Sequence, residues 1–218
     1  MQALKLLVAD DHEIVRKGFR AILEAQQDCE VIGEAGDGRR AVELTKELRP
    51  DIVVLDISMP LLNGLEAARQ IMKLRPQTKV LILTMHESDS LIREVLDTGA
   101  RGYILKTDAG RDLVSAVEAL RRNKTFFTSR VAQMILDGYL KGDAHPAEGD
   151  AARDRLTPRQ REIVQLLAEG KSSKEIAVAL GLSVKTAETH RANIMRKLDC
   201  HSVSEVVRYA IRNKIIDA

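Results

Sequence analysis

Four charged residues of this sequence each follow a short apolar run, a position from which their side chains can act together. They are Asp10, Asp11, Asp56 and Lys106. The run before Asp56 is rich in Val and Ile, as in a strand buried on both faces. The carboxyl ends of such strands open into the crevice where α/β sheets bind ligands. Three carboxylates and one ammonium at strand ends predict a site that handles phosphate with a divalent metal.

The chemistry of such a site follows from its charges. Carboxylates gathered in one place repel each other unless a cation lies between them. Mg²⁺ suits the set, because it binds a few carboxylate and carbonyl oxygens together with a phosphate oxygen. Asp56 is then able to attack phosphorus while the metal and Lys106 stabilise the phosphoryl oxygens. The acyl phosphate would add about −1.5 to −2 charges where one carboxylate stood.

Two further residues are positioned to report such a change in charge. Thr84 ends an apolar run and can donate a hydrogen bond to a phosphoryl oxygen. Tyr103, three residues before Lys106, could swing inward when Thr84 moves. The alternative is structural, a strand-end hydroxyl with a satisfied hydrogen bond and a ring that packs in the core. In the company of the three aspartates, the switch is the favoured interpretation.

The elements that must position these side chains alternate along residues 1–122. Apolar runs predict strands at 4–9, 30–34, 51–56, 79–84 and 102–106. Helical spacing lies between them at 13–26, 38–49, 64–75, 88–98 and 109–122. Five strand–helix repeats predict a flavodoxin-like, five-stranded parallel sheet with helices on both faces. No Gly-x-Gly-x-x-Gly follows the first strand, which weighs against a dinucleotide site.

The segment after this α/β region is predicted to separate two domains. Residues 123–152 form a linker with a short amphipathic helix, whose apolar positions are Val131, Met134, Ile135 and Leu136. The stretch 141–150 is polar and interrupted by Pro and Gly, which favours a flexible connection. The predicted domains are therefore 1–122 and 153–218.

The second domain shows no strand pattern and is predicted to be all-α. Its four helical patterns lie near 158–169, 173–180, 184–198 and 202–213. Thr157 and Pro158 form a helix start, and Ser172 with Glu175 has the spacing of a capping box. Gly181 lies in the short turn between the second and third helices, as in helix-turn-helix units.

Charge is unevenly distributed along the 218 residues, although the net charge is only +2. From Arg153 to the end, 13 basic side chains stand against 8 acidic ones. An anionic partner is therefore expected for the second domain alone. Cys29 and Cys200 are expected to be separate thiols. With no signal-peptide pattern and no apolar stretch of about 18 residues, the expectation is a cytoplasmic protein with no membrane contact.

The third helix of the second domain carries residues suited to DNA. Lys185, Glu188 and Thr189 lie on one side near its start and are predicted to reach base edges in the major groove. Glu188 can accept a hydrogen bond from cytosine N4. The predicted phosphate contacts are His190 and Arg191, with Lys171, Ser172, Ser173 and Lys197 as weaker candidates. The alternative is a solvated face of mixed charge, which most charged helix faces are.

Four motifs of the first domain occur in one order and spacing: Asp10-Asp11-His12, Leu55–Pro60 with Asn63-Gly64, Leu83-Thr84, and Gly102–Lys106. They resemble the receiver domain of two-component response regulators. The resemblance implies that Asp56 is the phosphoacceptor. It also implies that Mg²⁺ is held by Asp11, Asp56, the Ser58 carbonyl and, partly through water, Asp10.

The same resemblance bears on three neighbours of the site. Ser58 and His86 stand at positions that tune dephosphorylation in receivers. Thr107 replaces the Pro that many receivers carry after Lys106. A non-proline cis peptide bond costs about 3 kcal/mol, so the isomer of the Lys106–Thr107 bond is left open.

A second set of motifs covers the tail: Leu156–Glu162, Glu169-Gly170, Lys174–Ala177, Leu182-Ser183, Thr186–His190, Ile194 and Lys197-Leu198. This pattern resembles the LuxR-type helix-turn-helix, with Ala187 where that family usually has Val. Joined to a receiver, it resembles the NarL/FixJ class of response regulators.

The two resemblances imply a DNA-binding response regulator and not an enzyme. A histidine kinase would phosphorylate Asp56, release the third tail helix from the receiver and favour a homodimer on promoter DNA. One helix-turn-helix buries too little surface for strong specificity, so two half-sites are expected. Helix 202–213 offers an aliphatic stripe for pairing the tails, formed by Val203, Val206, Val207 and Ala210. RNA polymerase is a further candidate partner.

Two alternatives stay open at this point. A Mg²⁺-dependent phosphohydrolase with an aspartate nucleophile also uses an α/β sheet. Such enzymes usually need a second aspartate two residues after the nucleophile, where this chain has Ser58. The other alternative is a DNA-binding protein whose receiver serves only for dimerisation and is never phosphorylated. The complete acidic set weighs against it.

Overall fold

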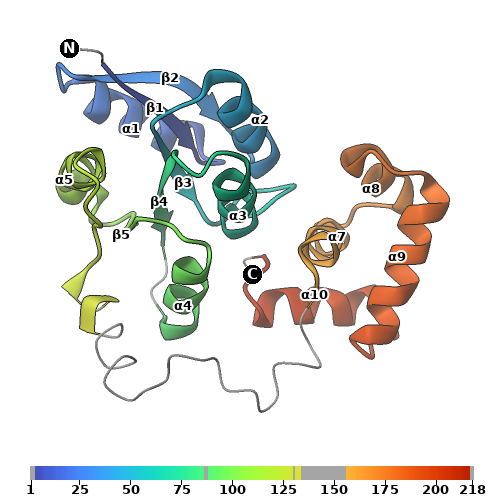
Figure 1. Ribbon diagram of the computed structural model, residues 1–218. Helices are drawn as coiled ribbons and strands as arrows, with labels where there is room; N and C mark the ends of the chain where they lie inside the picture. The colour runs from blue at the N-terminus through green and yellow to red at the C-terminus, as the bar shows by residue number, and fades with distance from the viewer. Residues whose placement is uncertain (1–2, 86–87, 130, 134–155, 217–218) are drawn as a thin grey trace. The chain divides into compact units, whose positions relative to one another are not determined.

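The structure is a computed structural model of the chain. It describes residues 3–85, 88–129, 131–133 and 156–216. The chain forms two compact units, Met1–Asp137 and Gly138–Ala218, and each is described by itself (Figure 1). None of the helices in the described residues has the length and the apolar character needed to cross a membrane.

Part of the predicted organisation falls outside the described residues. This is the case for the linker stretch 141–150 and for three of the four apolar positions of the short helix, Met134, Ile135 and Leu136. The predicted domain boundaries at 122 and 152 therefore stay predictions.

The first unit is built on a parallel five-stranded sheet, as predicted. Its strands are β1 (Leu4–Ala9), β2 (Cys29–Ala35), β3 (Ile52–Asp56), β4 (Lys79–Thr84) and β5 (Gly102–Leu105). The strand order is β2-β1-β3-β4-β5. The order changes direction between β1 and β3, and in open α/β sheets ligands bind beside this change, at the carboxyl ends of the strands.

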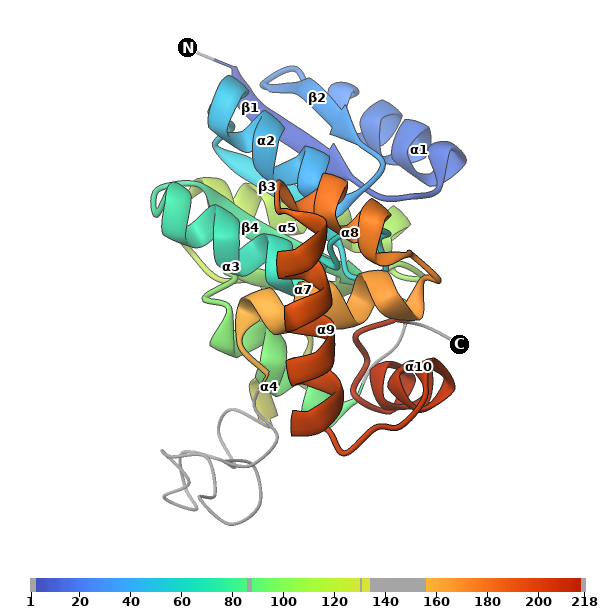
Figure 2. The ribbon, with the colours of Figure 1, turned by 90° about the vertical axis from the view of Figure 1, so that its right-hand side faces the viewer.

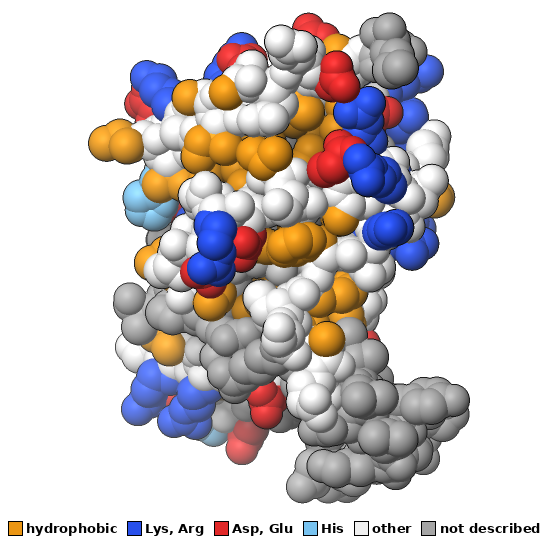
Figure 3. Space-filling model, turned by 90° about the vertical axis from the view of Figure 1, so that its left-hand side faces the viewer, with side chains coloured by type: hydrophobic (Ala, Val, Ile, Leu, Met, Phe, Trp, Pro, Cys, Tyr) orange, Lys and Arg blue, Asp and Glu red, His pale blue; other side chains and the backbone are white. Residues whose placement is uncertain are grey.

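Helices cover both faces of this sheet, because its central strand is buried on both sides. On one face lie α1 (Glu13–Glu24) and α5 (Ala109–Arg121); on the other lie α2 (Gly38–Leu48), α3 (Gly64–Leu74) and α4 (Asp89–Asp97). Each face of the sheet has its own hydrophobic core, and alternate residues of β3 point into one or the other. Ile52 and Val54 pack towards α1 and α5, whereas Val53 and Leu55 pack towards α2, α3 and α4. Figure 3 shows the outer side of the α1–α5 layer, where hydrophobic side chains lie between charged ones.

The chain continues to pack on the first unit after α5. Phe126 donates its N–H to the Arg101 carbonyl at 3.0 Å and accepts from the Tyr103 N–H at 2.9 Å. This short parallel pairing covers the outer edge of β5 beside Gly102. Val131, the one described apolar position of the predicted short helix, is fully buried in the core on the α2–α4 face. The described part of 123–133 thus has contacts of its own with the sheet.

The second unit is all-helical, as predicted, and contains α7 (Pro158–Ala168), α8 (Ser173–Leu180), α9 (Val184–Lys197) and α10 (Val203–Arg212). Its core is aliphatic, with Ile163, Ile176, Ile194 and Val206 almost completely buried. Ala187 of α9 is buried as well. Figure 2 shows α9 as a long helix running past α7 and α8.

Helix ends in this unit follow the predicted capping residues. Ser172 and Glu175 form the expected capping box at the start of α8. Thr157 caps α7 with Pro158 behind it, and here the box is completed by Gln160. Gly181 ends α8 with a φ of 62°, a left-handed conformation that glycine adopts without a Cβ penalty. These ends fix the turn that presents α9.

Candidate functional site

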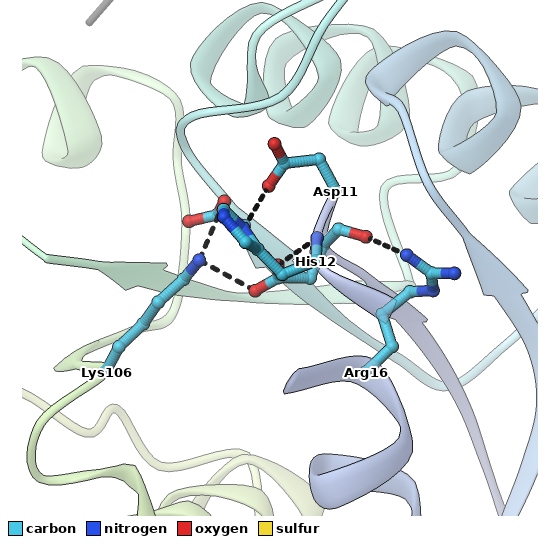
Figure 4. Close-up of polar contacts among 6 residues, drawn as sticks. Asp11, His12, Arg16 and Lys106 are labelled. Atoms are coloured by element: carbon cyan, nitrogen blue, oxygen red, sulfur yellow. Dashed lines mark hydrogen bonds and ion pairs between the residues drawn. The ribbon is translucent and has the colours of Figure 1, made fainter. Parts of the chain in front are cut away.

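The four charged residues predicted from the strand ends form one cluster in the first unit, called here the acidic pocket: Asp10, Asp11, Asp56 and Lys106. The Lys106 ammonium lies 2.7 Å from Asp10 Oδ2 and 2.9 Å from Asp56 Oδ2. Asp10 and Asp56 are almost fully buried, whereas the Asp11 side chain is 32% exposed. Figure 4 shows Lys106 reaching the loop that carries Asp11 and His12.

The topology explains why residues so distant in sequence meet. Ala9 of β1 pairs with Leu55 of β3, so the next residues, Asp10 and Asp56, leave neighbouring strands at the same edge. Asp56 in turn pairs with Leu83 of β4. The Lys106 N–H donates to the Thr84 carbonyl at 2.8 Å, which fixes the backbone from which its side chain turns back into the pocket.

The loop between β1 and α1 holds Asp10 in a defined conformation. The His12 N–H donates to Asp10 Oδ1 at 2.9 Å, and Arg16 Nη1 donates to the Asp10 carbonyl at 2.7 Å. His12 Nδ1 lies 2.7 Å from Asp11 Oδ1. The side chain of Asp10 is therefore oriented by the loop, and its second oxygen is turned towards Lys106.

The loop after Asp56 is held by close backbone packing. The Gly64 N–H donates to the Ile57 carbonyl at 2.8 Å, and Asn63 Oδ1 caps α3 by accepting from the Glu66 N–H at 2.9 Å. A Cβ on Gly64 would lie 1.9 Å from the Asp56 carbonyl oxygen. The glycine is thus required by the approach of α3 to the residue that carries the central carboxylate.

Electrostatics set the acidity of the pocket. Burial raises the pKa of Asp56 from 3.8 to about 6, against the opposing effect of the Lys106 ammonium, and the charges of Asp10 and Asp11 add to the rise. Burial alone would lower the pKa of Lys106, but its contacts with Asp10 and Asp56 outweigh burial and raise it. At neutral pH the pocket without metal therefore contains an ionised but unfavourably desolvated Asp56 carboxylate beside a charged lysine.

This acidity predicts a pH-dependent stability difference between Asp56→Asn and the native chain without Mg²⁺. The folded protein binds the Asp56 proton more tightly than the unfolded chain, whose pKa is near 3.8. This tighter proton binding adds to the free energy of unfolding. The added stability is complete below pH 3.8 and is lost as the pH rises through about 6. Asn carries no such charge, so the variant should be more stable by about 2 kcal/mol near neutral pH.

Urea unfolding followed by circular dichroism in a chelating buffer measures this difference. The gap between Asp56→Asn and the native chain should widen from about pH 4 to about pH 6 and then level off. The exposed Asp97→Asn on α4 is the matched control, and it should differ from the native chain by less than about 0.5 kcal/mol. A gap that does not change with pH would contradict the assignment of the raised pKa to Asp56.

The residues of the pocket fit a Mg²⁺ ion. Ligand atoms of Asp10, Asp11 and His12 lie within 4.8 Å of one another. Asp10 Oδ2 and Asp56 Oδ2 are buried, and in the described residues neither oxygen has an aligned hydrogen bond beyond its ion pair with Lys106. Buried carboxylate oxygens that point into one polar pocket are the donors that Mg²⁺ prefers. The sequence marks His12 only as part of a motif, and the fold brings its ring to both aspartates.

Of the two predicted reporter residues, Thr84 is tied to the pocket through Lys106, whereas Tyr103 lies within β5 and pairs with Ile82 of β4. Thr84 is 3% exposed and Tyr103 is fully buried, so the ring already lies inward in the core on the α2–α4 face. The Tyr103 N–H also bonds to Phe126, as described above. Ser58 is exposed in the loop after Asp56, and His86 lies outside the described residues. No peptide bond of the described residues is cis, which includes the Lys106–Thr107 bond.

The predicted DNA-binding side chains lie on the second unit. Lys185, Glu188 and Thr189 are exposed on α9, whereas His190 and Arg191 are half-buried. The Thr189 hydroxyl donates back to the Lys185 carbonyl at 2.9 Å. Two of the weaker candidates have internal contacts: Lys197 Nζ lies 3.4 Å from Gln160 Oε1, and the Ser172 hydroxyl is engaged in its capping box. Lys171 and Ser173 are half-buried.

The fold and the acidic pocket define a receiver domain, and the second unit defines a helix-turn-helix domain. Two protein families match the chain accordingly: the response regulator receiver domain at residues 6–118 and the bacterial regulatory proteins of the luxR family at residues 154–210. The chain therefore belongs to the two-component response regulators of the NarL/FixJ class, and it is a regulator of transcription and not an enzyme.

Similar proteins span nearly the whole chain. The transcriptional regulatory protein LiaR of Bacillus subtilis is 38% identical over 214 residues, which cover 98% of this chain and 100% of LiaR. The oxygen regulatory protein NreC of Staphylococcus carnosus is 38% identical over 216 residues, with the same coverage. These relatives support the regulator over the phosphohydrolase alternative.

Solved structures agree with this assignment. The RcsB response regulator of Salmonella typhimurium has a TM-score of 0.57 at 29% identity, covering 96% of this chain and 98% of that chain. An RcsB–DNA complex has the same TM-score at 28% identity, covering 95% and 98%. Both confirm the predicted fold class of receiver plus helical DNA-binding domain.

Proposed function

We propose that Asp56 is the phosphoacceptor and that a histidine kinase is the donor. The observation that carries the proposal is the Lys106 ammonium, which contacts both Asp10 and Asp56 in a buried pocket. An Asp56 oxygen forms the new bond to phosphorus. The bond between phosphorus and the imidazole nitrogen of the kinase histidine breaks, and its electron pair stays on that nitrogen. Lys106 then lies where a transferred phosphoryl oxygen carries negative charge.

Mg²⁺ is the cofactor that this pocket would hold. Asp10, Asp11 and Asp56 would bind it with the carbonyl of Ser58, and when bound it supplies positive charge to the phosphoryl oxygens. His12 keeps Asp10 and Asp11 oriented through its N–H and its ring. The residues of the loop therefore prepare the oxygens that would face the ion.

Thr84 and Tyr103 are proposed to relay the phosphorylation. Thr84 lies at the end of β4, and its carbonyl is bonded to Lys106, so a change at the pocket acts on this strand end directly. Tyr103 is buried on the neighbouring strand and is bonded through its backbone to Phe126. A shift of the Thr84 hydroxyl towards a phosphoryl oxygen would alter the packing beside Tyr103 and reach the segment that leaves the receiver.

The second unit is proposed to bind promoter DNA through α9. Lys185, Glu188 and Thr189 would reach bases, His190 and Arg191 would contact phosphates, and weaker phosphate contacts would come from Lys171, Ser172, Ser173 and Lys197. Their support is the exposed start of α9, held in a helix-turn-helix by the Gly181 turn. A homodimer formed on phosphorylation would place two such helices on two half-sites.

The remaining partners and boundaries are proposed on the same basis. Receiver residues 1–122, a linker at 123–152 and a DNA-binding domain at 153–218 would work in the cytoplasm, where promoter DNA and RNA polymerase are present. RNA polymerase is a candidate partner. Most of the predicted pairing stripe of α10 is used inside its own unit, because Val206 and Ala210 are buried in the core; Val203 is the stripe residue that stays exposed for pairing between two tails.

Lys185→Ala tests the DNA-binding face. Loss of this exposed side chain should weaken binding to promoter fragments by about tenfold, because a base or phosphate contact is worth about 1–3 kcal/mol. Gel shift over a series of salt concentrations measures both affinity and its salt dependence. A phosphate contact would lower the salt slope by about 1, whereas a base contact would leave it unchanged.

Arg208→Ala is the matched control, because Arg208 is an exposed cation of the same unit on α10. It should change affinity by less than about twofold. Acetyl phosphate with Mg²⁺ should strengthen binding by the native chain and shift it to a dimer in light scattering. Equal losses in Lys185→Ala and Arg208→Ala would argue for diffuse attraction by net charge and against α9 as the reading helix.

A further inference from the structure

We infer that Arg16 of α1 is a positioning residue for the acidic pocket and sets its affinity for Mg²⁺. This inference rests on the Mg²⁺ site proposed above. Arg16 donates from Nη1 to the Asp10 main-chain carbonyl at 2.7 Å. It is the second cation at the Asp10–His12 loop, and Figure 4 shows it approaching this loop from the side opposite Lys106.

Arg16 contacts the loop just before the start of α1, and the side chain at the N-cap of this helix does not fix that loop. His12 is the N-cap residue of α1, but its side chain makes no capping hydrogen bond. Arg16 lies one turn into α1, and helical side chains lean back towards the N-terminus, so its guanidinium extends over the loop. The carbonyl of Asp10 is thereby fixed from α1, while its amide is fixed by the Ala35 carbonyl of β2 at 3.1 Å.

Arg16 is itself held in place from β2. Its Nε lies 3.7 Å from Glu34 Oε2, and its side chain is only 17% exposed. Glu34 also accepts from Arg20 Nη1 at 2.8 Å. The guanidinium therefore spans from the β2 strand to the end of β1, which a planar group with several donors can do and a single ammonium cannot.

The choice of acceptor explains the effect on metal binding. Arg16 bonds to the backbone of Asp10 and leaves both carboxylate oxygens to the pocket. One of them is held by the His12 N–H and the other faces Lys106. Without Arg16, the loop would gain freedom at the residue that must present oxygens to the ion. Groups that orient metal ligands in this way typically affect metal affinity by about 10–100-fold.

The test measures the dissociation constant of Mg²⁺ from the full chain by isothermal titration calorimetry with magnesium chloride. Arg16→Met should raise the dissociation constant about tenfold. Arg16→Lys keeps the charge and can still donate to the Asp10 carbonyl, but it loses the planar fork of donors that also reaches Glu34, and should raise the constant only about threefold. Arg20→Met is the matched control, because it removes the other partner of Glu34 without touching Asp10. It should stay within about twofold of the native chain.

A second readout separates positioning from folding. Backbone amide NMR signals of Asp10–His12 should shift in both Arg16 variants without metal and stay unchanged in Arg20→Met. If Arg16→Met does not fold, Arg16→Lys alone decides, and an unchanged dissociation constant in it overturns the inference. Equal weakening by Arg16→Met and Arg20→Met overturns it too. Absence of Mg²⁺ binding by the native chain would instead remove the proposed metal site.

Discussion

Asp56→Asn is expected to receive no phosphoryl group from acetyl phosphate and Mg²⁺, whereas the native chain receives one. The amide is a poor nucleophile, and among the residues that the structure describes, the two neighbouring carboxylates of the pocket already have partners. Asp10 has one oxygen bonded to the His12 N–H and the other against Lys106. Asp11 is held by the His12 ring at 2.7 Å. Intact-protein mass spectrometry counts the added groups directly.

Two controls sharpen this result. Asp97→Asn on α4 is exposed and should be phosphorylated like the native chain. Asp11→Asn should be slower, because a predicted metal ligand is lost, but its phosphoryl group should still be on Asp56 after reductive trapping and peptide mapping. A native chain that accepts no phosphoryl group would support the receiver as a dimerisation module only. A group on Asp56→Asn at the native rate would point to another acceptor.

The sequence predicts the positions of some residues of this site and not of others, and the difference has a physical reason. Asp10, Asp56 and Lys106 follow apolar runs, and a parallel sheet brings strand ends together whatever the loops do. Their convergence could therefore be predicted from local pattern alone. The ends of β2 and β5 differ from the predicted ones by one residue, and this does not affect which side chains meet.

Other features depend on contacts between segments that sequence periodicity does not reveal. Arg16 occupies an ordinary helical position, and only the fold shows that its donor reaches the Asp10 carbonyl. Pairing of Phe126 with β5 likewise joins residues that no local pattern relates. The raised pKa of Asp56 results mainly from burial, which depends on the packing of the whole sheet. The residues proposed to face DNA could be predicted only as one side of a helix, because periodicity places them on a face and does not assign a base or phosphate to each.

Gly64 is part of a motif in the sequence, and the fold shows the contact that requires a glycine there. Its replacement is expected to have the largest effect on the free energy of unfolding. Gly64→Ala would place a Cβ 1.9 Å from the Asp56 carbonyl oxygen and 2.9 Å from the Ile57 Cα. Both neighbours are backbone atoms, so no side-chain rotation relieves the overlap. The start of α3 must move away from β3, at an expected cost of about 3 kcal/mol in the free energy of unfolding.

Gly18→Ala is the matched control for the same substitution. Gly18 lies inside α1, and an added Cβ there meets no atom within 4 Å. Alanine in a helix interior is favoured over glycine by about 0.5–1 kcal/mol, so this variant should be more stable than the native chain. Urea unfolding followed by circular dichroism should thus give stability changes of opposite sign for Gly64→Ala and Gly18→Ala.

The overlap at Gly64 involves the carbonyl oxygen of Asp56 itself. Gly64→Ala should therefore also slow phosphorylation by acetyl phosphate, measured without urea on the fully folded protein. Normal phosphorylation together with native stability would show that the loop after Asp56 adapts to the added methyl group, and that the close approach of α3 does not hold Asp56 in place.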